Sequence, residues 1–163
     1  TGGPPEDLQA ATDRFLALYG RALACHTRLY PGVEETLDRL TAGGARLALL
    51  TNKPQAPTLA ILEELRLAHW FAPDLVLGGD AGPPKKPDPA GLQTLLATAG
   101  ASPERAVMVG DSAADVGAAR AAGVFSIAVA YGYAQGRPED LGADRLIAAF
   151  PDLIAALQEG RAA

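Results

Sequence analysis

Residues 106–123 read AVMVGDSAADVGAARAAG, and this stretch decides the fold. It opens with a short apolar run, which predicts a buried strand at 106–110. A polar turn follows, and then an alanine-rich segment predicts a helix that stops at Gly123, where glycine supplies the left-handed cap. A strand, a polar turn and a helix in this order are typical of one unit of a parallel α/β sheet.

The same succession recurs on both sides of this unit. Upstream, the sequence predicts a helix that begins near Val33 and stops at Gly43, followed by a strand at 45–51. Further helices are expected around 59–65, at 92–99 and after 148, and further strands at 75–77, 125–129 and 145–148. Strands joined by helices need right-handed crossovers, which give a parallel sheet. We therefore predict a doubly wound, Rossmann-like α/β fold with helices on both faces of the sheet.

Composition and charge narrow the range of partners. The 163 residues carry a formal net charge of −5 and scattered basic side chains, which excludes nucleic acid and an anionic membrane surface as natural partners. No apolar run approaches the roughly 20 residues that cross a bilayer, and the N-terminus does not resemble a signal peptide, so we expect a cytoplasmic location. Cys25 continues an apolar helical stripe that starts at Leu8, which favours a buried structural thiol. His26 and His69 lack companion ligands at useful spacing and are expected to be structural.

In an open parallel sheet, ligands bind outside the carboxyl ends of the strands, so the residues after each predicted strand are site candidates. Thr51 and Asn52 come first, and a hydroxyl with backbone N–H groups at a turn into a helix can hold an anion. The alternative is an ordinary helix cap. After the next strand, prolines stiffen the chain around Lys86, which suits an ammonium aimed at a phosphate. The alternative is that Lys85 and Lys86 are two solvated surface lysines.

The most specific feature is the pair Asp111 and Asp115 in the segment GDSAAD. Asp111 ends a predicted strand, and the spacing of four residues brings both carboxylates to one side of the first helical turn. Close carboxylates repel each other unless a divalent cation lies beside them, and Mg²⁺ accepts one or two carboxylates together with a substrate phosphate. The alternative is that Asp111 caps the helix and Asp115 faces solvent.

In this order, Thr51-Asn52, Lys86-Pro87-Asp88-Pro89 and Gly110-Asp111-Ser112 with Asp115 resemble the motifs of the haloacid dehalogenase superfamily. The resemblance implies that Thr51, Asn52 and Lys86 bind the phosphoryl group, with Thr51 and Lys86 acting in catalysis, and that Asp111 and Asp115 hold Mg²⁺. The paired acids disfavour the metal-free dehalogenases of the superfamily. Further likeness in 50–54, 78–80, 85–87 and 131–133 is to the phosphoglycolate phosphatase branch.

The chain departs from the superfamily pattern in one respect. The family's nucleophile lies in an Asp-x-Asp segment that closes a first, central strand, and no such segment occurs in these residues. We therefore expect residues 1–28 to be the remnant of a helical cap and residues 29–163 to be a core that lacks its central strand. Exposed strand edges seek partners, so we also expect strand completion by another segment or self-association.

The resemblance implies a Mg²⁺-dependent phosphatase for a small phosphorylated metabolite, with 2-phosphoglycolate as the expected substrate and an aspartyl-phosphate intermediate. Within the enzyme class, the alternatives are another phosphatase of the same fold or a sugar-phosphate mutase. The alternative from another class is a catalytically inactive phosphate-binding or interaction module that keeps Thr51, Lys86 and Asp111 without a nucleophile.

Overall fold

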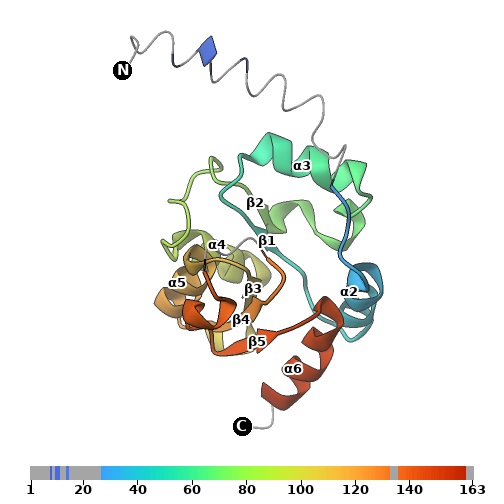
Figure 1. Cartoon of the computed structure of the whole chain (residues 1–163). Coiled ribbons are helices and arrows are strands. Elements are labelled where there is room, and N and C mark those ends of the chain that lie inside the picture. The colour runs from blue at the N-terminus through green and yellow to red at the C-terminus, as the bar shows by residue number, and fades with distance from the viewer. Residues whose placement is uncertain (1–7, 9, 12–13, 15–26, 133–135, 161–163) are drawn as a thin grey trace.

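A computed structural model describes residues 8, 10–11, 14, 27–132 and 136–160 (Figure 1). Leu8, Ala10, Ala11 and Arg14 are helical. The rest of the predicted cap remnant up to residue 26, including Cys25 and His26, lies outside the described residues, as does Tyr133.

Helices and strands alternate along the described chain. The helices are α2 (Val33–Ala42), α3 (Gln55–Glu64), α4 (Ala90–Ala99), α5 (Ala113–Ala122) and α6 (Leu153–Gly160). The strands are β1 (Leu49–Leu50), β2 (Val76–Leu77), β3 (Val107–Gly110), β4 (Phe125–Val129) and β5 (Arg145–Ile147). Short 3-10 helices occupy Ala68–Trp70, Pro73–Leu75, Pro103–Arg105, Pro138–Leu141 and Phe150–Asp152. The predicted order of elements from residue 33 onward is confirmed.

Two helix ends follow the predicted glycine rule, whereas Gly43 after α2 has a negative φ of −77°. Gly100 after α4 and Gly123 after α5 adopt left-handed backbone angles, with φ of 61° and 69°. An alanine at either position would be strained, because L side chains rarely adopt this region. At the start of α4, the carboxylate of Asp88 accepts a hydrogen bond from the N–H of Ala90, 2.9 Å away. These caps set where each helix leaves the sheet.

The strands form two parallel sheets. β1 pairs with β2 in one sheet, and β3, β4 and β5 lie in that order in the other. Within the described residues, no strand hydrogen bonds join β1 to β3. The prediction of parallel strands is confirmed.

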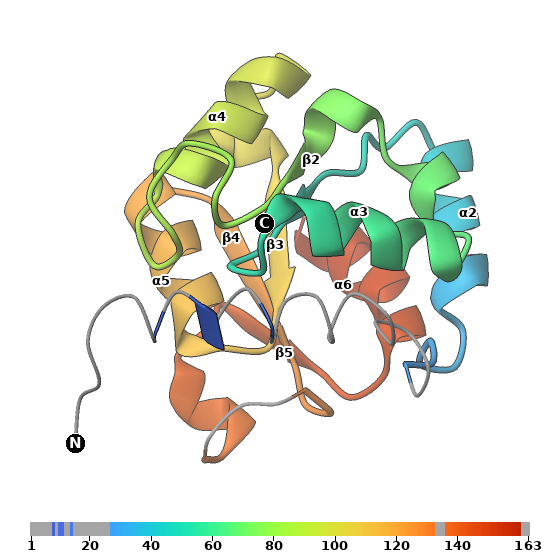
Figure 2. The ribbon, with the colours of Figure 1, turned by 90° about the horizontal axis from the view of Figure 1, so that it is seen from above.

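Helices cover both faces of the three-stranded sheet (Figure 2). On one face, Ile127 and Val129 of β4 pack with Ile147, Leu153 and Ala156, and Leu40 of α2 joins them. On the other face, α4 and α5 bury a second cluster formed by Leu92, Leu96, Ala119 and Val124. Adjacent residues of β3 serve opposite faces, because Met108 packs against the second cluster and Val109 against the first. The doubly wound arrangement is therefore confirmed.

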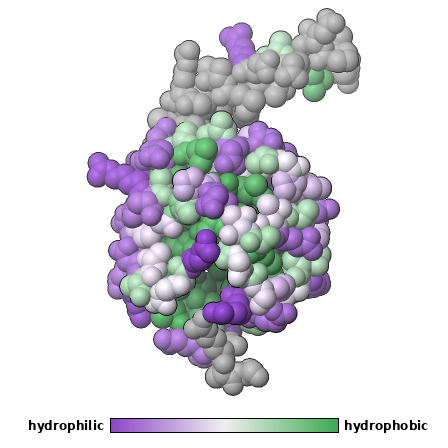
Figure 3. Space-filling model, turned by 180° about the vertical axis from the view of Figure 1, so that it is seen from behind, coloured by the Kyte–Doolittle hydropathy of each residue, from purple (hydrophilic) through white to green (hydrophobic). Residues whose placement is uncertain are grey.

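β1 and β3, which belong to different sheets, are less buried than β4. Four of the five residues of β4 are buried, but Val107 in β3 is 37% exposed and both residues of β1 are only half-buried. Apolar surface also reaches the exterior on the face shown in Figure 3. Among the described residues, no helix is both long enough and apolar enough to cross a membrane.

Candidate active site

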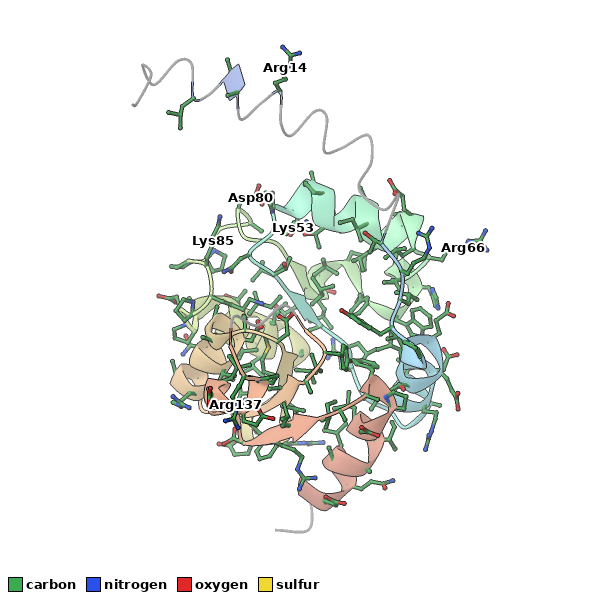
Figure 4. All side chains as sticks on the ribbon, viewed as in Figure 1. Arg14, Lys53, Arg66, Asp80, Lys85 and Arg137 are labelled. Atoms are coloured by element: carbon green, nitrogen blue, oxygen red, sulfur yellow. The ribbon has the colours of Figure 1, made fainter. Side chains whose placement is uncertain are left out.

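The ammonium group of Lys86 lies where the carboxyl end of β1 meets the N-terminus of α5. Its Nζ donates to the carbonyl oxygen of Leu50 at 2.7 Å and to Oδ1 of Asp115 at 2.6 Å. The Lys86 and Asp115 side chains are only 10% and 8% exposed. The surface alternative is therefore wrong for Lys86, although it holds for Lys85, which is exposed (Figure 4).

Asp115 is held by the first turn of its own helix. Its Oδ2 accepts hydrogen bonds from the N–H of Asp111 at 3.0 Å, the N–H of Ser112 at 3.0 Å and the hydroxyl of Ser112 at 2.6 Å. Ser112 and Asp115 form a capping box, in which each side chain contacts the other residue's backbone N–H. A Cβ at Gly110 would lie 2.4 Å from the Cβ of Asp115, so glycine is required for this fold-back.

These contacts determine the ionisation of Asp115. Burial alone would raise its pKa, but the hydrogen bonds from Lys86 and Ser112, together with the Lys86 charge, lower the pKa below the ordinary value of 3.8. The carboxylate is therefore charged at neutral pH and forms a buried ion pair with Lys86.

Thr51 and Asn52 form the turn that follows β1. The N–H of Thr51 donates to the carbonyl of Leu77 at 3.0 Å, which continues the pairing of β1 with β2. Its Oγ1 accepts from the N–H of Lys53 at 3.2 Å, so the hydroxyl hydrogen is what Thr51 can offer to an anion. The side chain of Asn52 pairs with the backbone of Lys86, accepting at Oδ1 and donating from Nδ2, each at 2.9 Å.

The segment Gly78-Gly79-Asp80 holds this turn from the other side. Gly79 N–H donates to the carbonyl of Lys53 at 2.7 Å, and Asp80 Oδ1 accepts from the N–H of Gln55 at 2.6 Å. Figure 4 shows Lys53, Asp80 and Lys85 on neighbouring loops beside the start of α3. The side chain of Gln55 bridges the backbone of Val76 and Gly78. Sequence reasoning missed Gln55, whose only signal is Gly78, where a Cβ would lie 2.5 Å from the Gln55 backbone.

Asp111 borders a cleft of about 250 Å³ at the carboxyl end of β3. A Cβ at Gly132 would lie 2.1 Å from the Cβ of Asp111, so the loop after β4 closes directly on this carboxylate. Burial, followed by the proximity of Tyr30, Asp111 and Asp152, raises the pKa of Tyr131. The cleft is lined by Tyr30, Val33, Val109, Gly110, Asp111, Val129, Tyr131, Gly132 and Phe150.

The donor set accommodates Mg²⁺ only in part. No group of three or more His, Cys, Asp or Glu side chains with a metal-binding arrangement occurs within the described part of the chain. Both oxygens of Asp115 are engaged with Lys86, Ser112 and backbone N–H groups, so direct ligation would break those bonds. Asp111 is a hard oxygen donor at the strand end, which fits an ion that takes one or two carboxylates and completes its shell with water and phosphate.

Hydrogen bonds join three of the five predicted site residues, because Asn52 contacts Lys86 and Lys86 contacts Asp115, and Thr51 precedes Asn52 in the same turn. Asp111 adjoins them through its backbone N–H on Asp115. A buried ammonium beside a hydroxyl-bearing turn and a strand-end carboxylate is suited to binding a phosphate oxyanion.

Residues 3–123 match the model of the haloacid dehalogenase-like hydrolases. The chain belongs to this family. Among curated relatives, Phosphoglycolate phosphatase 1 of Pseudomonas aeruginosa is 44% identical over 133 residues, which are 82% of this chain and 48% of the relative. The phosphoglycolate phosphatase of Rhodospirillum rubrum is 43% identical over 144 residues, which are 88% of this chain and 58% of that protein.

Solved structures show the same fold. A predicted phosphoglycolate phosphatase from Haemophilus somnus superposes with a TM-score of 0.90 at 32% identity, covering 96% of this chain and 69% of the other. A putative β-phosphoglucomutase from Thermotoga maritima superposes with a TM-score of 0.69 at 31% identity, covering 79% of this chain and 59% of the other. The chain spans about half the length of the first curated relatives it matches.

Proposed function

We propose that this protein is a Mg²⁺-dependent phosphatase that hydrolyses a small phosphate monoester, with 2-phosphoglycolate as its substrate. The observation that carries the proposal is the buried Lys86 ammonium, held between Leu50 and Asp115 beside the Thr51 turn. The names of the relatives from Pseudomonas aeruginosa and Rhodospirillum rubrum support the choice of substrate.

In this proposal each residue acts on the phosphoryl group through charge or hydrogen bonding. Lys86 neutralises an equatorial oxygen, and the Thr51 hydroxyl donates to another as negative charge develops. Asp111 is the carboxylate that would hold Mg²⁺, and the bound ion would spread the remaining charge. The family resemblance implies a carboxylate nucleophile, which forms an acyl phosphate as the ester oxygen leaves, and water then releases phosphate. Lys86, Thr51 and Asp111 do not supply that nucleophile.

We further propose that an additional strand joins β1 to β3. The facing edges of these strands are not paired with each other in the described part of the chain, and both strands are incompletely buried. Parallel edges of this kind offer backbone N–H and C=O groups to a partner. Such a strand would end beside Lys86, where the family places its nucleophile.

The predicted cytoplasmic location stays a prediction.

A sugar-phosphate mutase is the second candidate. The superposition with the Thermotoga maritima protein, titled a putative β-phosphoglucomutase, favours it. Both candidates would use the same phosphate-binding residues, and they differ in the acceptor of the phosphoryl group, which is water for the phosphatase and a sugar hydroxyl for the mutase.

The test incubates the natural protein with 2-phosphoglycolate or β-glucose 1-phosphate, each with Mg²⁺ and with EDTA, and measures both the phosphate released and the isomerisation of the sugar phosphate. We expect hydrolysis of 2-phosphoglycolate that EDTA abolishes, about tenfold or more above that of the sugar phosphate. Isomerisation of the sugar phosphate would favour the mutase. Phosphate binding without turnover of any monoester would contradict the enzyme and favour an inactive binding module.

A further inference from the structure

The carboxamide of Asn52 contacts both backbone groups of a single residue. Its Oδ1 accepts from the N–H of Lys86, and its Nδ2 donates to the carbonyl of Lys86, each at 2.9 Å. The orientation of the amide is fixed by this pairing, because a backbone N–H only donates and a carbonyl only accepts. Two bonds to one residue restrain its rotation as well as its position.

The backbone of Asn52 is in turn held by close contact with the loop at Gly79. A Cβ at Gly79 would lie 2.4 Å from the carbonyl oxygen of Asn52, so the two chains are in close contact. The hydrogen bond from Gly79 N–H to Lys53 holds the following residue. A rigid path therefore leads from the loop after β2 to the Asn52 side chain and on to Lys86.

The far end of Lys86 is held separately. Its Nζ donates to Leu50 and Asp115, both of which belong to other segments. The ammonium is thus placed by its backbone anchor at one end and by two acceptors at the other. Loss of the backbone anchor would let the side chain shift while the acceptors remain.

We propose that Asn52 is a positioning residue that sets the place of the Lys86 ammonium and acts through Lys86, not as an independent phosphate ligand. The inference rests on the proposed phosphatase function. It assigns the single asparagine of the chain a structural link to the charge that meets the phosphate.

Kinetics of the natural protein on 2-phosphoglycolate test this by a double-mutant cycle. Asn52→Ala should lower kcat/KM about tenfold, and Lys86→Ala about a hundredfold or more. Adding Asn52→Ala to Lys86→Ala should change the rate less than about threefold, because the residue through which Asn52 acts is already gone. If the two substitutions together lower kcat/KM by the product of their separate effects, Asn52 acts independently of Lys86 and the proposal is overturned. Gln93→Ala, an exposed change on α4, is the matched control.

Amide hydrogen exchange tests the link without any activity. Asn52→Ala removes the acceptor of the Lys86 N–H, so its exchange should become about fivefold to tenfold faster. Asn52→Asp keeps an acceptor oxygen and should retain most of the protection, and the remote amide of Val124 should not change. If the natural protein hydrolyses no phosphate ester, the proposed function is wrong, but hydrogen exchange still tests whether Asn52 holds the backbone of Lys86. Faster exchange at Lys86 supports the link, and unchanged exchange overturns it.

Discussion

The ion pair between Asp115 and Lys86 is the residue-scale feature on which the site depends. Replacing Asp115 by Asn leaves the buried ammonium without its counter-charge. Breaking a buried pair in this way costs about 3–5 kcal/mol, so urea denaturation should show a loss of that order. Asp140→Asn, at an exposed position, should change the unfolding free energy by less than about 0.5 kcal/mol. Equal stability of the two variants would contradict the role of the pair.

The same pair predicts a pH dependence of stability. The folded pKa of Asp115 lies below the ordinary value of 3.8, so its contribution is complete above that pH and is lost as pH falls through the folded value. The stability difference between wild type and Asp115→Asn should therefore be constant near neutrality and shrink below pH 3.8. Urea midpoints measured from pH 7 to pH 3 check this. A difference that grows on acidification would contradict it.

Residue types and their order along the chain indicated the candidate site, and the structure shows which of its residues are in contact. The spacing of Asp111 and Asp115 correctly placed Asp115 in the first turn of a helix, whereas Asp111 lies before the N-cap Ser112. It could not show that Ser112 and Lys86 occupy the oxygens of Asp115, because the capping box and the contact across the fold depend on tertiary structure. The pairing of Asn52 with Lys86 is hidden from the sequence for the same reason.

At the scale of elements, the turn from β3 into α5 depends on Gly110. An alanine there would bring its Cβ within 2.4 Å of the Cβ and Cγ of Asp115. Since the neighbour is held by its own helix cap, the clash should cost about 1–3 kcal/mol and disturb the contact with Lys86. Thermal unfolding of Gly110→Ala checks this, with Gly43→Ala as the control, where the nearest atom would be 3.3 Å away at a negative φ. Equal unfolding temperatures would contradict the packing argument.

The strand predicted at 45–51 departs most from the structure, whereas the other predicted strands match to within one residue at either end. Local signals mark helix ends, as Gly100 and Gly123 show, so α5 matches its predicted bounds and α4 ends where predicted but begins two residues earlier. The apolar run at 45–51 predicted a full strand, but only Leu49 and Leu50 are paired. A strand is defined by its neighbours, and β1 has hydrogen bonds to β2 alone among the described strands. Sequence patterns do not contain that information.

At the scale of the whole molecule, the division of the sheet should be visible in hydrogen exchange. The amides of Ile127 and Val129 lie in a strand paired on both sides, whereas Leu49 and Leu50 lie in one paired on one side. Exchange at the β4 amides should be about tenfold slower or more. Equal protection, together with a mass above the monomer in sedimentation, would mean that another copy covers the free edge.

The central claim is that Lys86 is the charge that meets the phosphoryl group, and its neighbour Lys85 provides the control. The most direct measurement is the rate of Mg²⁺-dependent phosphate release from 2-phosphoglycolate by the natural protein and its Lys86→Ala and Lys85→Ala variants. The account predicts a loss of about a hundredfold or more for Lys86→Ala and a change within about twofold for the exposed Lys85. Equal rates for the two variants, or a larger loss at Lys85, would contradict it.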